Sequence, residues 1–265
     1  MESRDQLQES VPKRAIEKLS NRFRIIGDIA IVSIPPEMSE YKRAISEALI
    51  DGRRNIKTVL NKVSKIEGDR RVASFEILAG SDTVTVHKEL GCSYRLDVSR
   101  VFFNSSLAYE RGRIAQITRP GENVLVPFCG VGPFAIPVAA RGAKVVAVES
   151  NSEACRWMAE NTRQNGVEDS ISIIKGDAFQ IPGMIKLSFD RAVIPTPYGR
   201  DDILEIISPA VKKGGLIHFY TFKKRRQIEG LIETYRSMNL DVQFYRKSGN
   251  VAPGVSRWAF DLVKL

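Results

Sequence analysis

From residue 122 onward, short apolar segments alternate with amphipathic ones, and this alternation constrains the fold more than any other feature of the sequence. The apolar segments have the length and β-branched content of buried strands, and the segments between them have the apolar periodicity of helices. Strands and helices in this order build a mostly parallel sheet covered by helices on both faces. For residues 104–265 we therefore predict an α/β, doubly wound, Rossmann-like domain whose final two strands form an antiparallel hairpin.

Residues 23–103 have a different pattern. An alternating segment around Gly27 and Asp28, a helical segment over 36–52 and several short strands predict a small α+β domain. The first 22 residues are charged and lack an apolar signal core, so we expect a mobile basic arm and no secretion signal.

Composition narrows the class of protein further. The 3 cysteines are widely spaced and there are only 2 histidines, which gives neither a zinc-ligand spacing nor a disulfide framework. No apolar run reaches the ~18 residues that a membrane span requires. We expect a cytoplasmic monomer with no metal and no membrane partner. The net charge of +9 raises the odds of a nucleic-acid partner, although a basic balance also serves solubility alone.

The predicted strand ends indicate where a ligand binds, because ligands of doubly wound sheets lie beyond the carboxyl ends of the strands. The first strand runs into glycines at 130 and 132, which let the backbone pass close to a ligand. Glu149 follows the second strand, where acidic residues accept hydrogen bonds from ribose hydroxyls. Asp177 follows the third strand and is placed to accept from an adenine amino group, and Pro195 follows the fourth.

Pro133 indicates which nucleotide binds at the glycines. It removes an N–H donor where a dinucleotide pyrophosphate would be held, and the Walker sequence of nucleotide hydrolases is absent. S-adenosylmethionine carries ribose, adenine and an amino-acid tail without phosphate, and therefore fits better. The residues that we predict to contact this cofactor at the strand ends are Phe128, Cys129, Gly130, Val131, Gly132, Phe134, Glu149, Ser150, Asp177, Ala178 and Pro195.

The stretch GVGPFAIPVAARGAKVVAVESNSEACRWMAENTRQNGV, residues 130–167, resembles the cofactor-binding half of the tRNA guanine-37 N1-methyltransferases of archaea and eukaryotes. It also resembles the related aminocarboxypropyltransferases of the wybutosine pathway. The resemblance continues through VHKELGCSYRLDVSRVFFNSSLAYERGRIA and NVAPGVSRWAFDL, and it covers the chain from about residue 23. It implies S-adenosylmethionine as the cofactor and the anticodon loop of tRNA as the partner.

The resemblance also implies roles for single residues. YERGR at 109–113 matches the family's Glu-Arg motif, in which Glu110 acts as general base on the N1 proton of the target guanine and Arg111 organises the site. Arg95 is a candidate for contacting the target nucleotide, and Phe103 for bordering the cofactor or the base. Without the resemblance, Glu110 and Arg111 would be interpreted as an ordinary ion pair on a helix surface.

Two departures from the N1-methyltransferase pattern keep a second reaction open. Pro195 stands where those enzymes have an asparagine, and Val126 stands where the family has an acidic residue. The sequence GVGPF favours methylation of N1 of guanine-37, whereas APGV and the short length favour aminocarboxypropyl transfer to a wyosine precursor at the same tRNA position. A methyltransferase for another substrate and an inactive RNA-binding homologue are the further alternatives.

Basic clusters and aromatic residues are the candidate RNA contacts, because cations bind phosphates and unstacked bases stack on aromatic rings. We expect residues 23–103 to face the RNA or the substrate. For each aromatic candidate, a place in the core is an equal alternative. The basic clusters are 13–24, 51–57, 68–71, 223–226 and 245–250, and the aromatic candidates are Tyr198, Phe102, Phe103 and Trp258.

Overall fold

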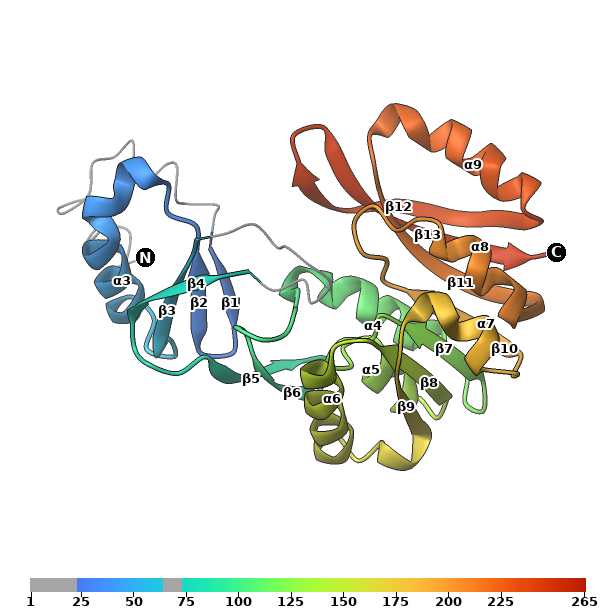
Figure 1. The fold of residues 1–265 in the computed structure, drawn as a ribbon, viewed down its shortest axis with the longest axis horizontal. Helices are drawn as coiled ribbons and strands as arrows, with labels where there is room; N and C mark the ends of the chain where they lie inside the picture. Colours follow the sequence, from blue (N-terminus) through green and yellow to red (C-terminus); the bar gives the residue numbers. More distant parts are fainter. Residues whose placement is uncertain (1–22, 64–72) are drawn as a thin grey trace. The chain divides into compact units, whose positions relative to one another are not determined.

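The structure, a computed structural model, describes residues 23–63 and 73–265 and divides into two compact units, Met1–Ser105 and Ser106–Leu265 (Figure 1). The predictions for the arm at 1–22 and for the basic cluster at 68–71 lie outside the described residues. Among the helices that the structure describes, none is long and apolar enough to cross a bilayer.

The N-terminal unit contains a four-stranded sheet and a separate two-stranded one. Its elements are β1 (Arg24–Ile26), β2 (Ile29–Val32), the 3₁₀ helix η1 (Pro36–Tyr41), α3 (Lys42–Asp51), β3 (Thr58–Lys62), β4 (Phe75–Ala79), β5 (Val84–Glu89) and β6 (Cys92–Asp97). β1 and β2 form the antiparallel pair predicted around Gly27, and β2 pairs parallel with β3 across α3. α3 buries Ile45 and Leu49 in a cluster with Val59.

The C-terminal unit has the predicted doubly wound fold. Its elements are η2 (Ser105–Leu107), α4 (Ala108–Ile117), β7 (Asn123–Pro127), α5 (Ala135–Ala139), β8 (Lys144–Glu149), α6 (Ser152–Gln164), η3 (Glu168–Ser170), β9 (Ile171–Lys175), η4 (Ala178–Gln180), α7 (Ile181–Met184), β10 (Phe189–Ile194), α8 (Ile203–Ile207), η5 (Ser208–Ala210), β11 (Val211–Lys223), η6 (Arg225–Gln227), α9 (Ile228–Ser237), β12 (Leu240–Ala252) and β13 (Val255–Lys264). The strand order is β12-β13-β11-β10-β7-β8-β9. β7 to β11 pair in parallel, and β13 pairs antiparallel with both β11 and β12, which confirms the predicted terminal hairpin.

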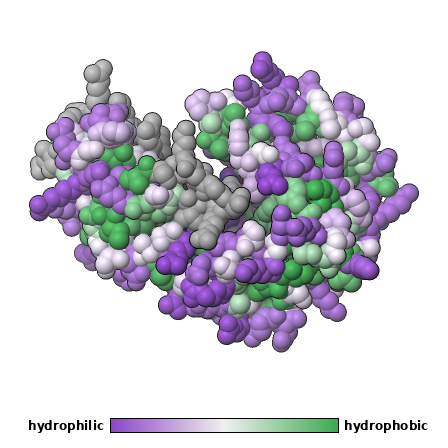
Figure 2. All heavy atoms as spheres, in the orientation of Figure 1, coloured by the Kyte–Doolittle hydropathy of each residue, from purple (hydrophilic) through white to green (hydrophobic). Residues whose placement is uncertain are grey.

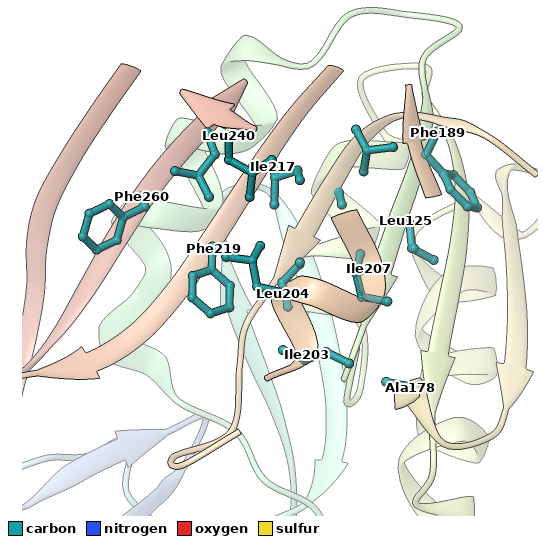
Figure 3. Packing of buried hydrophobic residues seen from close by; sticks show 14 of the residues in the cluster. Leu125, Ala178, Phe189, Ile203, Leu204, Ile207, Ile217, Phe219, Leu240 and Phe260 are labelled. Carbon is teal, nitrogen blue, oxygen red and sulfur yellow. The ribbon is translucent and has the colours of Figure 1, made fainter. Parts of the chain in front are cut away.

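Strand order reverses beside β7, since β8 and β9 lie on one side of it and β10 and β11 on the other. This reversal is where doubly wound sheets bind their ligands. A large apolar cluster holds the sheet to its helices, with Leu125 and Ile217 from strands packed near Leu204 and Ile207 of α8 (Figure 3). Hydrophilic side chains predominate on the face of this unit shown in Figure 2, as expected once the apolar side chains are inside.

The apolar periodicity of residues 200–215 predicts one helix, and here the structure differs most from expectation. α8 ends at Ile207, and the chain enters β11 at Val211. Pro209 lies between them, and a proline in the helix interior removes a hydrogen bond and clashes with the preceding turn. The strand β11 is consequently longer than the sequence pattern indicated.

Candidate active site

The turn after β7 has the backbone of a ligand-binding turn. Phe128 has a φ of 53°, a left-handed conformation that bulky residues rarely adopt, and Gly130 and Gly132 have φ of 56° and 95°. A Cβ on Gly132 would lie 2.8 Å from Cδ1 of Ile136, so that position also lacks space for a side chain. Such strain persists where the surrounding structure enforces it, typically at functional sites.

Glu149, at the end of β8, is bound to this turn. Its Oε2 accepts a hydrogen bond from the backbone N–H of Gly130 at 2.9 Å, and its Oε1 accepts one from that of Asn151 at 2.9 Å. The structure therefore brings Glu149 and the glycine turn together, as predicted. Each carboxylate oxygen has a second lone pair, which leaves acceptor capacity for ribose hydroxyls.

The ends of β9 and β10 lie at the same sheet edge. Asp177 follows β9, is exposed, and accepts a hydrogen bond from the backbone N–H of Phe179 at 3.0 Å. The Phe179 ring lies 6.1 Å from the ring of Phe128, which joins the ends of β9 and β7. Pro195 follows β10 directly and is half-buried. Beside these residues, Ser150 is exposed and Ala178 is buried.

Three predicted cofactor residues direct their side chains into the core. Cys129, Val131 and Phe134 are all nearly fully buried, and Sγ of Cys129 lies 3.3 Å from Sδ of Met158. Burial raises the pKa of the Cys129 thiol well above its usual value, so this cysteine is neutral and is no nucleophile. These three residues are available to a cofactor through their backbone.

The edge as a whole fits S-adenosylmethionine. Glu149 and Asp177 supply carboxylate acceptors for hydroxyl and amino groups, and the half-buried Pro133 has no N–H to offer a phosphate. The positive φ angles of the turn place backbone rather than side chain against a ligand. The individual cofactor contacts stay predictions.

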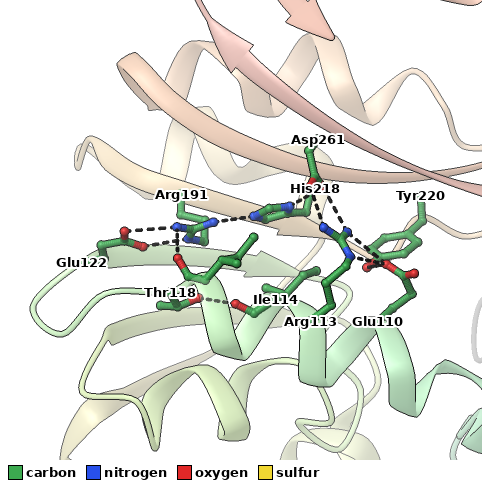
Figure 4. Close-up of polar contacts among 10 residues, drawn as sticks. Glu110, Arg113, Ile114, Thr118, Glu122, Arg191, His218, Tyr220 and Asp261 are labelled. Carbon is green, nitrogen blue, oxygen red and sulfur yellow. Dashed lines mark hydrogen bonds and ion pairs between the residues drawn. The ribbon is translucent and has the colours of Figure 1, made fainter. Parts of the chain in front are cut away.

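Glu110 lies in the first turn of α4 and is 2% exposed, so it is not part of an exposed surface ion pair. Its Oε2 accepts hydrogen bonds from Nε and Nη2 of Arg113 at 3.1 and 3.0 Å and from the hydroxyl of Tyr220 at 3.2 Å (Figure 4). Its Oε1 has no hydrogen bond among the described residues, although Nη1 of Arg246 lies 3.3 Å away. One oxygen of a buried carboxylate is thus left with acceptor capacity.

Arg113 continues this network away from Glu110. It donates to Asp261 through Nη1 at 2.6 Å and Nη2 at 3.1 Å, and Asp261 lies 2.6 Å from Nδ1 of His218. Nε2 of His218 lies 2.5 Å from Nη1 of Arg191, which is itself paired with Glu122 at 2.7 Å (Figure 4). Four elements, α4, β10, β11 and β13, are connected inside the unit by charged groups and by the imidazole of His218.

The network has a defined protonation. Burial lowers the pKa of His218 below its usual value, in spite of the hydrogen bond to Asp261 that raises it. Although burial raises the pKa of Asp261, hydrogen bonds from His218 and Arg113 lower it to about 2. Burial and the charge of Glu110 raise the pKa of Tyr220 well above its usual value. Near neutral pH, His218 is neutral, Asp261 is charged and Tyr220 is a hydroxyl donor.

Arg111 connects the Glu-Arg motif to the glycine turn. Its guanidinium carbon lies 5.9 Å from the centre of the Phe134 ring, and that ring lies 5.4 Å from the ring of Tyr220. Because Tyr220 donates to Glu110, a continuous line of contacts runs from Glu110 to the turn after β7. The structure thus brings both residues of the motif to the predicted cofactor edge.

The other residues predicted to contact the nucleotide or the RNA differ in how exposed they are. Arg95 is exposed on β6, and the buried Phe103 packs its ring 4.9 Å from that of His87, both within the N-terminal unit. Their roles stay predictions. Tyr198 is 61% exposed and accessible for stacking, whereas Trp258 is 3% exposed and belongs to the core.

Sequence reasoning missed the residues that hold Glu110 in place. Arg113 lies three residues after Glu110 on the same helix face, a spacing that pairs side chains. Arg191, His218 and Asp261 each interrupt an apolar strand, and a charged or polar residue within a buried strand needs a buried partner. Those interruptions were the available signal, but they do not say which residue pairs with which.

Comparison with known proteins assigns the family. The TRM5/TYW2 methyltransferase domain matches residues 85–242, and the TYW2 N-terminal domain matches residues 3–83. The chain is 36% identical over 214 residues to the tRNA (guanine(37)-N(1))-methyltransferase Trm5b of Pyrococcus abyssi, covering 80% of this chain and 63% of that protein. The chain therefore spans less than two thirds of the length of that relative.

A second relative matches over nearly its full length. The tRNA(Phe) (4-demethylwyosine(37)-C(7)) aminocarboxypropyltransferase of Pyrococcus horikoshii is 31% identical over 267 residues, covering 98% of this chain and 95% of that protein.

Two solved structures are similar. The structure described as the complex of aTrm5 and tRNALeu has a TM-score of 0.90 at 26% identity, covering 99% of this chain and 78% of that one. P. horikoshii TYW2 in complex with MeSAdo has a TM-score of 0.78 at 29% identity, covering 99% and 97%. With a family model matching more than half of the chain and an edge that fits the cofactor, this protein belongs to the TRM5/TYW2 family and is an S-adenosylmethionine-dependent transferase.

Proposed function

We propose that this protein modifies the nucleotide at position 37 of tRNA, and that it transfers the methyl group of S-adenosylmethionine to N1 of guanine. The relative that is 36% identical is named for this reaction, and the structure with the TM-score of 0.90 is a complex with tRNA. The positive charge of the chain supports an RNA substrate.

The observation that carries this proposal is Oε1 of Glu110, which accepts no hydrogen bond among the described residues and has an ion pair with Arg246 at 3.3 Å. S-adenosylmethionine supplies a methyl group activated by its sulfonium. As N1 of guanine forms its bond to the methyl carbon and the carbon–sulfur bond breaks, the N1 proton must leave. Oε1 of Glu110 is buried, has no hydrogen bond among the described residues, and is positioned to accept that proton.

The surrounding residues fix the orientation of the Glu110 carboxylate. Arg113 and Tyr220 both bind Oε2, so the carboxylate is oriented with Oε1 away from them. Arg113 is itself fixed by Asp261, which prevents rotation of the guanidinium. Alignment of donor and acceptor then supplies much of the rate enhancement, because the leaving group is already activated.

Aminocarboxypropyl transfer to a wyosine precursor is the second candidate. It is favoured by the match to 95% of the P. horikoshii aminocarboxypropyltransferase and by the TYW2 N-terminal domain at residues 3–83. Pro195, in place of the asparagine of the N1-methyltransferases, also favours it. Here the target base attacks the aminocarboxypropyl carbon that is attached to sulfur, the bond between that carbon and sulfur breaks, and a proton again leaves the base.

One experiment separates the two reactions. The protein is incubated with unmodified tRNA and with tRNA carrying the wyosine precursor, using cofactor labelled either in the methyl or in the carboxyl group. Nucleoside mass spectrometry then identifies the product. We expect methyl label in 1-methylguanosine; carboxyl label in the wyosine product would establish the second candidate instead. Absence of both labels from every tRNA would contradict the proposed function.

A further inference from the structure

A pocket of about 860 Å³ lies at the turn of the β12–β13 hairpin, within the C-terminal unit. Its lining includes Arg225, Arg246 and Lys247, the rings of Tyr245 and Trp258, and the turn at 250–254, and it includes no carboxylate. Its volume is in the range of pockets that bind small organic ligands such as a nucleotide.

Among the described residues, two of the three cations that line this pocket lack the partners that surface cations usually have. In the part of the chain that the structure describes, neither Arg225 nor Lys247 forms an ion pair, and both are exposed. The guanidinium of Arg225 lies 5.4 Å from the centre of the Trp258 ring, which fixes it over the pocket. Trp258 is held in turn by a hydrogen bond from its Nε1 to the carbonyl of Lys223 at 3.2 Å.

The hairpin turn lies at the same sheet edge as the cofactor residues. β11 runs parallel to β10 and β7, and its final residue Lys223 pairs with Ser256, next to the turn. The carboxyl edge of the parallel strands therefore continues into the hairpin turn at the border of the sheet (Figure 1).

Arg246 connects the pocket to the proposed general base. Its Nη1 lies 3.3 Å from Oε1 of Glu110, and its guanidinium carbon lies 4.3 Å from the centre of the exposed Tyr109 ring. From Glu110, contacts continue through Tyr220 to Phe134 at the glycine turn. A ligand in the pocket is thus one side chain away from the oxygen that receives the proton.

We propose that this pocket binds the backbone phosphate of a single-stranded RNA nucleotide adjacent to the target base, and so positions that base at Glu110. Arg225 and Lys247 bind the phosphate, because cations without internal partners and without nearby carboxylates favour an anion. Tyr245, which is 38% exposed, offers a ring face for the base of the same nucleotide. The proposal rests on the proposed function, since it names a binding site for the same RNA substrate.

The test is the salt dependence of tRNA binding by the double variant Arg225→Gln with Lys247→Gln. Each phosphate neutralised on a single strand contributes about 0.7 to the slope of log Kd against log salt, and both side chains bind one phosphate, so the double variant should lose about 0.7 from the slope. The matched control is Lys144→Gln with Lys213→Gln. Both lysines are exposed near the amino ends of β8 and β11, at the opposite sheet edge, and the control removes the same charge.

The possible outcomes distinguish failure of the proposed RNA site in the pocket from failure of the proposed function. If the slope of log Kd against log salt were the same in the double variant and in the control, the pocket would not be an RNA site. Transfer to tRNA by the unmodified protein would still support the proposed function. If the unmodified protein bound no tRNA at low salt, both would fail together. Guanosine monophosphate is the second probe: binding as tight as that of tRNA, lost in the double variant, would assign the pocket to a small nucleotide and overturn the RNA assignment.

Discussion

Nη1 of Arg191 donates a hydrogen bond to Nε2 of His218 at 2.5 Å, and this contact fixes the state of the imidazole. A guanidinium has no acceptor, so Nε2 must carry the lone pair and Nδ1 the proton. The Nδ1–H then donates to Asp261 at 2.6 Å, and protonation of His218 would place a second hydrogen against Arg191. The histidine is therefore a neutral link between two charged groups.

Replacement of His218 by Gln tests this neutral state through the pH dependence of stability. Burial lowers the pKa of His218, so below about pH 6.5 the unfolded chain binds a proton that the folded protein does not. The free energy of unfolding therefore falls as the pH decreases through this range, by at most about 1.4 kcal/mol per pH unit. Gln at 218 keeps a donor and an acceptor but does not titrate.

We expect urea unfolding at pH 7.5 and pH 5.5 to show a drop in the unmodified protein that is about 1 kcal/mol larger than the drop in His218→Gln. Asp261 does not contribute in this window, because its pKa of about 2 and the ordinary value of a carboxyl group both lie below it. Equal drops in the two proteins would show that His218 is protonated in the fold.

Glu110→Gln tests the proposed general base. The amide keeps the shape of the carboxylate but cannot take up the N1 proton, so we expect single-turnover transfer to slow by about 10²- to 10⁴-fold. The control is Glu229→Gln in the first turn of α9, where the glutamate is exposed and the same charge is removed. Thermal unfolding of both variants checks the fold. A transfer rate unchanged in a folded Glu110→Gln protein would remove Glu110 from the chemistry.

Asp177→Ala tests the cofactor edge. The exposed carboxylate is expected to bind the cofactor by one charged hydrogen bond, so its loss should weaken binding of S-adenosylhomocysteine about tenfold, as measured by calorimetry. Asp169→Ala is the control, because Asp169 is an exposed acidic residue next to the amino end of β9. If the two variants bound equally well, Asp177 would have no part in the cofactor site.

Gly132→Ala and Gly121→Ala together separate backbone strain from lack of space. Both glycines have positive φ, 95° and 82°, but a Cβ at Gly121 meets no atom within 4 Å, whereas at Gly132 it lies 2.8 Å from Ile136. We expect Gly121→Ala to lower the free energy of unfolding by about 1 kcal/mol and Gly132→Ala by about 1–3 kcal/mol more. Equal losses in urea unfolding would mean that Ile136 moves aside without cost.

The sequence pattern was sufficient to predict the doubly wound sheet, because the central strands are mostly apolar and helices such as α6 and α9 are amphipathic. It also predicted which residues meet at the sheet edge, since parallel strands end on the same side and Glu149 follows the strand next to Gly130. It did not predict the end of α8, where Pro209 overrides an otherwise helical segment. The proline, and not the apolar pattern, determines where α8 ends.

The partners of Glu110 were beyond sequence reasoning for a physical reason. The spacing between Glu110 and Arg113 is visible in a helix, but Tyr220, Arg246 and Asp261 come from β11, β12 and β13. Which side chains meet across these elements depends on strand register and on the place of β13 between two neighbours. A register shift of one residue would turn each of these side chains to the opposite face of the sheet.

The contact between Arg113 and Asp261 joins positions 148 residues apart, and this separation has a consequence for synthesis. A ribosome adds roughly 5–20 residues per second, so Asp261 is made roughly 7 to 30 seconds after Arg113. During that interval, the helix that carries Glu110 has neither Asp261 nor the strand that supplies it. Translation therefore sets the earliest moment at which the general base can be held in its working orientation, however fast the parallel strands fold.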